Sequence, residues 1–122
     1  MRTLNIFFCV AVAATFCTAS LAGAPPPAGA SAFAVVGSDG SLVRGNAIGA
    51  SQINTGAYIV EFGHSVKRCV FTATTGSTSV GTPPDGSVTV AGANGDPTGV
   101  YVTTFNATGD AADAAFHLNV RC

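Results

Sequence analysis

Residues 116–122 read Phe-His-Leu-Asn-Val-Arg-Cys, alternating apolar and polar side chains at every step. Successive side chains of a β-strand point to opposite faces, so the even-numbered positions, all apolar, share one face. The odd-numbered positions, beginning with His117, point the other way, towards water. One buried and one wet face is typical of an antiparallel sheet. This strand therefore predicts an all-β fold.

The chain upstream shows similar signals, short apolar runs separated by Gly, Pro and Asp. Asp39-Gly40 between two such runs predicts a hairpin. The single helix candidate, 110–115, is too short and is expected to be a loop or one turn. About seven or eight strands with regular turn signals predict a small antiparallel β-sandwich, jelly-roll or immunoglobulin-like. The expected strands are 33–36, 41–44, 57–62, 69–74, 87–90, 100–106 and 116–122.

Two cysteines belong to the expected domain. Cys69 shares a strand face with Phe71 and Ala73, and Cys122 lies on the apolar face of the last strand. If both faces line the core, the two sulfurs meet, and an oxidising compartment would keep them paired. We therefore expect a Cys69–Cys122 disulfide, closing a loop of about 54 residues and contributing about 4 kcal/mol to stability. Two cysteines are too few for a structural zinc site.

The first residues are typical of an export signal. Residues 1–24 combine Arg2, an uncharged apolar run at 6–16 and small residues, the layout of a cleaved signal peptide. We expect cleavage after Ala22, a Pro/Ala/Gly linker at 25–31 and a β-sandwich domain at 32–122. The apolar run is shorter than the roughly 20 residues that span a membrane, so no span is expected in the mature chain. The mature protein is expected to be secreted, periplasmic or extracellular, with an uncleaved anchor as the alternative.

Composition and net charge exclude two classes of protein. The chain has 122 residues, only 9% of them charged, and a formal net charge of −1. This length suits one domain. Such a charge excludes electrostatic binding to nucleic acid, and such a composition excludes charge-driven disorder.

One binding hypothesis concerns the segment 64–68. His64, Lys67 and Arg68 form a small basic group beside an expected turn. Such a group could bind an anionic glycan or a lipid head group. The alternative is a solvated turn with no ligand.

A second hypothesis concerns the strand at 100–106. Tyr101 and Phe105 share one face, and Val100 and Val102 share the other. Aromatic side chains supply much of a small domain's burial, so we expect the aromatic face in the core. If it is exposed instead, it forms an interface or a sugar-binding surface.

Catalysis and metal binding find little support. His117 with nearby Asp113 would still need a nucleophile and a pocket, so we expect no enzyme. The loop aspartates fit no EF-hand pattern and are explained by turn formation, so no metal and no cofactor is expected. These aspartates are Asp85, Asp96, Asp110 and Asp113.

Residues 56–62, Gly-Ala-Tyr-Ile-Val-Glu-Phe, have the pattern G-x-Y-x-V-x-F, and 99–105, Gly-Val-Tyr-Val-Thr-Thr-Phe, follows later. With these strands, residues 41–122 resemble small exported bacterial proteins of unknown function. They are similar, more loosely, to the C-terminal tip modules of phage tail fibres. That similarity implies a compact β-sandwich that binds surface receptors, often as a homotrimer.

Three functions follow from these expectations. The first is a non-enzymatic binding or adhesion module with a glycan or other surface ligand, self-associating as a trimer. The second is a structural subunit of a surface layer or appendage, which low charge and Thr/Gly-rich strands would suit. The third, a small secreted enzyme, has the weakest support because few titratable groups are available to form a pocket.

Overall fold

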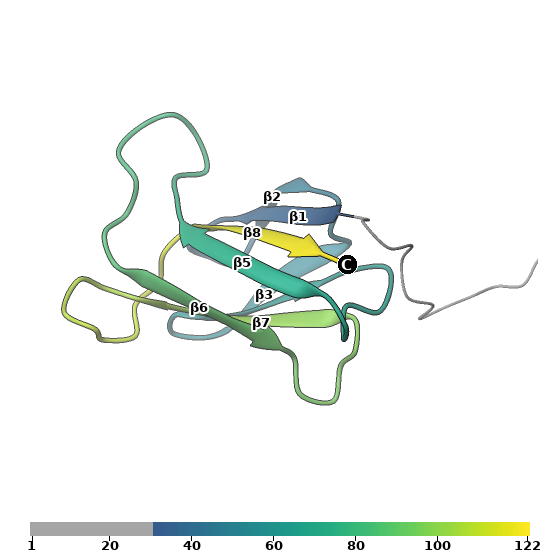
Figure 1. Cartoon of the computed structure of the whole chain (residues 1–122). Helices are drawn as coiled ribbons and strands as arrows, with labels where there is room; N and C mark the ends of the chain where they lie inside the picture. Colours follow the sequence, from purple (N-terminus) through teal and green to yellow (C-terminus); the bar gives the residue numbers. More distant parts are fainter. Residues whose placement is uncertain (1–30) are drawn as a thin grey trace, which may run out of the picture.

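The computed structural model describes residues 31–122, which form eight β-strands and no helix. The strands form two four-stranded antiparallel sheets packed as a sandwich (Figure 1). Sheet A has the order β2-β1-β8-β5, and sheet B has the order β3-β4-β7-β6. The bounds are β1 Ser31–Val36, β2 Leu42–Gly45, β3 Gly49–Asn54, β4 Ala57–Glu61, β5 Val70–Thr75, β6 Ser87–Gly92, β7 Gly99–Phe105 and β8 Phe116–Arg121.

The predicted all-β sandwich is confirmed. The predicted leader at 1–24 and residues 25–30 of the predicted linker lie outside the described residues. Ser31, assigned to the linker by sequence, begins β1. Residues 110–115 form a loop, as expected, with one isolated bridge between Ala111 and Phe105.

The predicted hairpin at Asp39-Gly40 joins β1 to β2. Its turn closes through two backbone hydrogen bonds, from Gly40 to the Gly37 carbonyl and from Gly37 to the Ser41 carbonyl, each 2.9 Å long. Gly40 has a φ of 85°, which favours glycine, and a side chain here would collide with the backbone of Gln52. The hairpin turn therefore packs directly against β3 of the other sheet.

The core forms where the inner faces of the sheets meet. The alternation of β8 holds, because its even-numbered residues are buried and its odd-numbered residues face outwards. Tyr58 and Phe116 are among the largest fully buried side chains of this core, and their ring centroids lie 5.2 Å apart. The predicted disulfide is present, and both Cys69 and Cys122 pack half-buried against the core.

The expectation for the β7 strand is wrong. Val100 and Val102 face the core, and Tyr101 and Phe105 face outwards. The β4–β7 register explains this, because it places Val102 opposite the fully buried Tyr58. With the Tyr58 ring filling that part of the core, the strand opposite has room only for smaller side chains.

Thr104 is the buried polar residue on the inner face of β7. Its hydroxyl donates a 2.6 Å hydrogen bond to the carbonyl of Ala112, so it is satisfied without water. The inner face of β7 therefore combines two valines with a hydrogen-bonded threonine, and the prediction failed because it gave the aromatic side chains priority for burial.

Candidate functional site

The outer face of sheet A contains a groove that crosses three strands. β8 lies between β1 and β5, and its outward residues form cross-strand rows with both neighbours. One row joins Phe33, Asn119 and Thr72, and the next joins Val35, His117 and Thr74. These six residues, with the backbone between them, line a groove of about 330 Å³.

Phe33 forms one wall of the groove and is well fixed. Phe33 is 49% exposed, whereas the core phenylalanines Phe62 and Phe116 are buried. Its backbone is held by Asn46, whose Oδ1 accepts a 2.8 Å hydrogen bond from the Phe33 N–H and whose own N–H donates to the Phe33 carbonyl. A rigid strand therefore presents an exposed aromatic ring beside the polar side chain of Asn119.

The start of the β5–β6 loop is hydrogen-bonded to two outward residues of sheet A, one of which, His117, lines the groove. The carbonyl of Ser77 lies 2.9 Å from His117 Nε2, so this nitrogen carries the hydrogen and donates. Arg44 Nη1 donates a 2.7 Å hydrogen bond to the carbonyl of Thr78 in the same loop. Val35 lies between Arg44 and His117 in the same cross-strand row, faces outwards and is only 6% exposed.

His117 and Asp113 are not brought together as a catalytic pair. Asp113 Oδ1 accepts hydrogen bonds from Gln52 Nε2 at 2.6 Å and from the Gly56 N–H at 2.7 Å. These bonds, with that of Gly56 the larger cause, lower the pKa of Asp113. Asp113 therefore organises the β3–β4 turn of sheet B, and His117 belongs to the outer face of sheet A.

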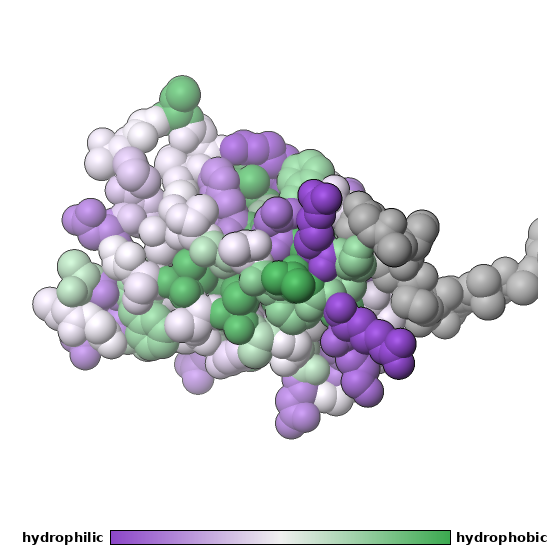
Figure 2. All heavy atoms as spheres, viewed as in Figure 1, coloured by the Kyte–Doolittle hydropathy of each residue, from purple (hydrophilic) through white to green (hydrophobic). Residues whose placement is uncertain are grey.

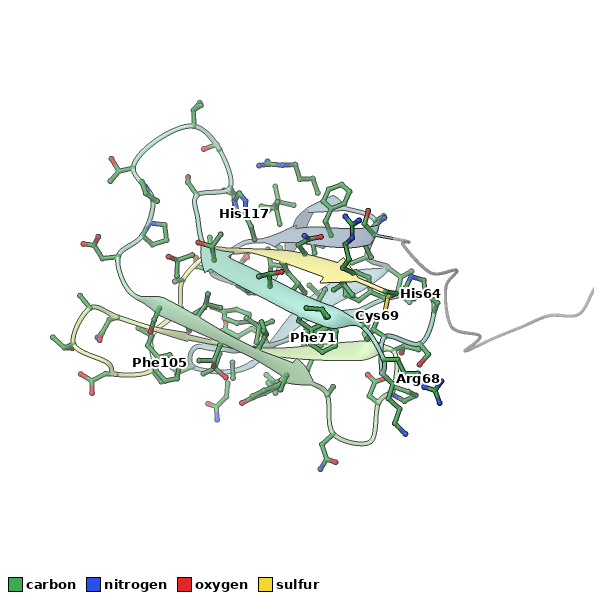
Figure 3. All side chains as sticks on the ribbon, in the orientation of Figure 1. His64, Arg68, Cys69, Phe71, Phe105 and His117 are labelled. Carbon is green, nitrogen blue, oxygen red and sulfur yellow. A yellow bond between two sulfur atoms is a disulfide. The ribbon has the colours of Figure 1, made fainter. Side chains whose placement is uncertain are left out.

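The basic residues at 64–68 lie in the β4–β5 loop at one end of the sandwich (Figure 3). Lys67 and Arg68 are exposed, and the His64 ring stacks on Phe62 with centroids 6.3 Å apart. Lys67 lines a second depression of about 390 Å³, which Asp96 also lines. Acidic and basic groups therefore share this depression, which weakens its attraction for an anion.

Asp96 also forms a carboxyl pair with Glu61. Thr98 Oγ1 lies 2.9 Å from Glu61 Oε2 and 2.9 Å from Asp96 Oδ1. The hydrogen bond between the two carboxyl groups raises the pKa of Glu61, as does partial burial, and lowers the pKa of Asp96. Glu61 is therefore the member of the pair that holds a proton more readily.

The two aromatic candidates lie on the outer face of sheet B. Tyr101 is 36% exposed and is flanked across the sheet by Ile59 and Ala91. Phe105 is half-buried at the other end of the molecule from Arg68 (Figure 3). The five binding residues predicted from sequence thus occupy two separate surfaces, neither of which includes the groove on sheet A.

The sequence prediction missed the groove residues Phe33, Thr72 and Asn119. The alternation of β8 does place Asn119 on an outward face. Its neighbours follow only from the strand order, which the linear sequence does not reveal.

The loop aspartates serve local structure. Asp110 Oδ2 lies 3.0 Å from the Thr108 hydroxyl, and Asp85 lies exposed before β6. Within residues 31–122, no three His, Cys, Asp or Glu side chains converge as metal ligands. The same residues contain no helix of the length and hydropathy that a membrane-spanning segment requires.

No family model, curated protein or solved structure matches this chain.

Proposed function

We propose that this chain is an exported, non-enzymatic β-sandwich module that binds a ligand at the cell surface or outside the cell. The observation that carries this proposal is the groove across β1, β8 and β5, with an exposed Phe33 ring beside Asn119 and Thr72. Ligand sites are commonly concave and mostly apolar, with a few polar groups that fix orientation.

Export is supported by two independent features. The leader predicted at 1–24 would direct secretion. The disulfide between Cys69 and Cys122 is the kind of bond that persists in oxidising compartments. A module of this kind would meet its ligand outside the cytoplasm.

The absence of catalysis is part of the proposal. The hydrogen-bond partners of His64 and His117 are the backbone carbonyls of Ser65 and Ser77, not carboxylates. A general base is normally oriented by an acidic partner and placed beside a nucleophile. The described histidines do not have that arrangement.

Glycan binding tests the proposal. The chain is purified after export and screened against immobilised glycans and cell-surface polysaccharides. Phe33→Ala is expected to weaken binding about tenfold, a change of about 1.4 kcal/mol. Tyr101→Ala is the matched control, because it removes an exposed aromatic ring from the opposite sheet. Loss of binding in Tyr101→Ala alone would move the ligand to sheet B, and a chain that binds no probe would contradict the proposal.

A second function, a structural subunit that self-associates, is favoured by one flank of the sandwich. β5 and β6 are edge strands of different sheets and lie against each other (Figure 1). Figure 2 shows hydrophobic residues gathered along this seam. They are Phe71, Ala73, Val88 and Val90, which are half-buried, and the exposed Val70 lies beside them on the outer face of β5.

The two flanks differ in protection against edge pairing. On the β2/β3 flank, both edge strands pair with an irregular register, and β2 carries Arg44. Neither β5 nor β6 contains a charged residue or a proline. Bulges and charges are the usual means of blocking edge-to-edge association, so the β5/β6 flank is the unprotected one.

Light scattering after gel filtration tests self-association. An oligomer that Val70→Lys with Ala91→Lys converts to monomer would support assembly through this flank. A trimer would agree with the similarity to tail-fibre tips, and avidity towards a repeated ligand would follow. A monomeric wild-type chain would contradict the structural function and leave the groove as the basis of the binding function.

A further inference from the structure

Charge is segregated between the two sheets. The strands of sheet A carry Arg44 and Arg121 and no acidic residue. The strands of sheet B carry Glu61 and no basic residue. Sheet A therefore presents a positive outer face, although the whole chain has a net charge of −1.

Arg121 lies next to the groove. It follows Asn119 on the outward face of β8 and is exposed. The register pairs Ser31 with Arg121 and Phe33 with Asn119, so Arg121 is the diagonal cross-strand neighbour of Phe33. Diagonal neighbours are about 7–8 Å apart, within reach of a long side chain. Arg121 thus lies one row beyond Phe33 and Asn119, at the edge of the residues that line the groove.

The carboxylate of the β1–β2 turn lies at the other end of β1 from Arg121. Asp39, in the β1–β2 turn, bonds to the N–H and hydroxyl of Ser41. That turn follows Val36, at the end of β1 opposite to Arg121's partner Ser31. The cross-strand partners of Arg121 are Ser31 and Val70, and neither is acidic.

We propose that the groove binds an acidic sugar, a pyranose ring against Phe33 whose carboxylate or sulfate group pairs with Arg121. The inference rests on the proposed binding function and adds the ligand class. The ring's C–H face would contact the aromatic wall, and Asn119 and Thr72 would hydrogen-bond to its hydroxyl groups. A guanidinium group offers paired N–H donors that match a carboxylate or sulfate.

The test uses ligands that differ only in charge. Binding of an α-1,4-linked oligogalacturonate is compared with binding of its methyl ester, which keeps the sugar backbone and removes the negative charge. Dextran sulfate and dextran form the second pair and separate sulfate from carboxylate recognition. We expect a charged member to bind more tightly than its neutral partner, with affinity that falls as salt rises.

Two arginine variants test which positive charge of the protein the acidic ligand contacts. Arg121→Gln keeps a hydrogen-bonding side chain without charge and is expected to weaken binding of the acidic ligand about tenfold. Arg68→Gln removes an equal charge from the loop before β5, beside the Cys69–Cys122 disulfide, and is expected to weaken binding less than Arg121→Gln does, because Arg68 belongs to none of the cross-strand rows of the groove.

The outcomes separate this inference from the proposed function. The neutral ligands could bind as well as the acidic ones, with binding that Phe33→Ala weakens and Arg121→Gln does not. In that case the binding function stands and the acidic ligand class is wrong. If Arg68→Gln abolishes binding and Arg121→Gln does not, the anion lies at the 64–68 loop instead. If none of the four ligands binds, the inference is overturned, and the wider glycan screen alone decides the binding function.

Discussion

The hydroxyl of Tyr58 donates a 2.8 Å hydrogen bond to the carbonyl of Ser38, tying β4 of sheet B to the β1–β2 turn of sheet A. The same oxygen accepts a 3.3 Å bond from the N–H of Ala114 in the β7–β8 loop. Three segments far apart in the sequence therefore meet at one fully buried side chain.

Tyr58→Phe is expected to lower the free energy of unfolding by about 1–3 kcal/mol, because it leaves the buried Ala114 N–H without this partner. Urea denaturation of the oxidised protein measures the loss. Tyr101→Phe, on the outer face of sheet B, is the control and should change stability by less than about 0.5 kcal/mol. Equal effects of the two substitutions would contradict the structural role of the Tyr58 hydroxyl.

Cys69→Ser is expected to destabilise the domain by about 2–5 kcal/mol, because the unfolded chain loses its covalent loop. The melting temperature should fall, and Cys122 should become reactive to a thiol probe. Cys122→Ser should produce an equal loss, and the double variant should add nothing to it. Two reactive thiols in the unreduced wild-type chain would disprove the bond.

Gly40→Ala is expected to destabilise through both strain and collision. Alanine at a positive φ costs about 1–2 kcal/mol, and the methyl group would also press on the backbone of Gln52. Gly95→Ala isolates the first effect, since Gly95 has a φ of 72° and open space around it. Chemical denaturation should show a loss about 1–3 kcal/mol larger for Gly40→Ala. Losses of the same size would mean that the turn moves freely away from β3.

Mild acid is expected to stabilise the domain through Glu61. The folded state raises the pKa of this carboxyl above its ordinary 4.5, so the folded chain binds the proton more tightly than the unfolded chain. The stabilisation is complete below the ordinary value and is lost as pH rises through the raised one, so it should grow as pH falls from neutral towards about 4.5. Glu61→Gln should remove this part of the melting-temperature profile, and a Glu61→Gln profile that parallels the wild type there would refute it.

Strong acid is expected to destabilise the domain. The pKa of Asp113 is lowered by the Gly56 N–H, and the pKa of Asp39 by the Ser41 hydroxyl. Their stabilisation is present above the ordinary value of 3.8 and is lost as pH falls through the lowered values. Asp113→Asn should therefore flatten the profile below about pH 4 while leaving the Glu61-dependent gain in milder acid intact. If the melting temperature of this variant falls in strong acid as steeply as that of the wild type, Asp113 is not the source of the acid destabilisation.

Part of the fold could be predicted from patterns among residues that are neighbours in the sequence. The alternation in β8 and the Asp39-Gly40 turn depend on neighbouring residues alone, and both predictions are confirmed. The pairing of Cys69 with Cys122 followed because both faces pointed to one core. β3 escaped prediction because Gly49–Asn54 has a polar, glycine-containing sequence and is a strand only through pairing with β4.

The binding surfaces depend on long-range placement. The faces of β7 were assigned wrongly because the buried Tyr58 ring, not the strand's own pattern, decides which side is the core. The groove combines Phe33, Thr72 and Asn119, whose strands become neighbours only when β8 inserts between β1 and β5. No spacing along the chain indicates that arrangement.

The place of β8 also dictates an order of assembly. Sheet B can begin from two local hairpins, β3–β4 and β6–β7. In sheet A, β1 and β5 each need β8, the last strand in chain order, before they belong to one layer. Contacts between distant parts of a chain form slowly, so sheet A should be the late step of folding. Until β8 arrives, neither the groove nor its ligand contacts exist, and recognition by sheet A reports that the whole domain has folded.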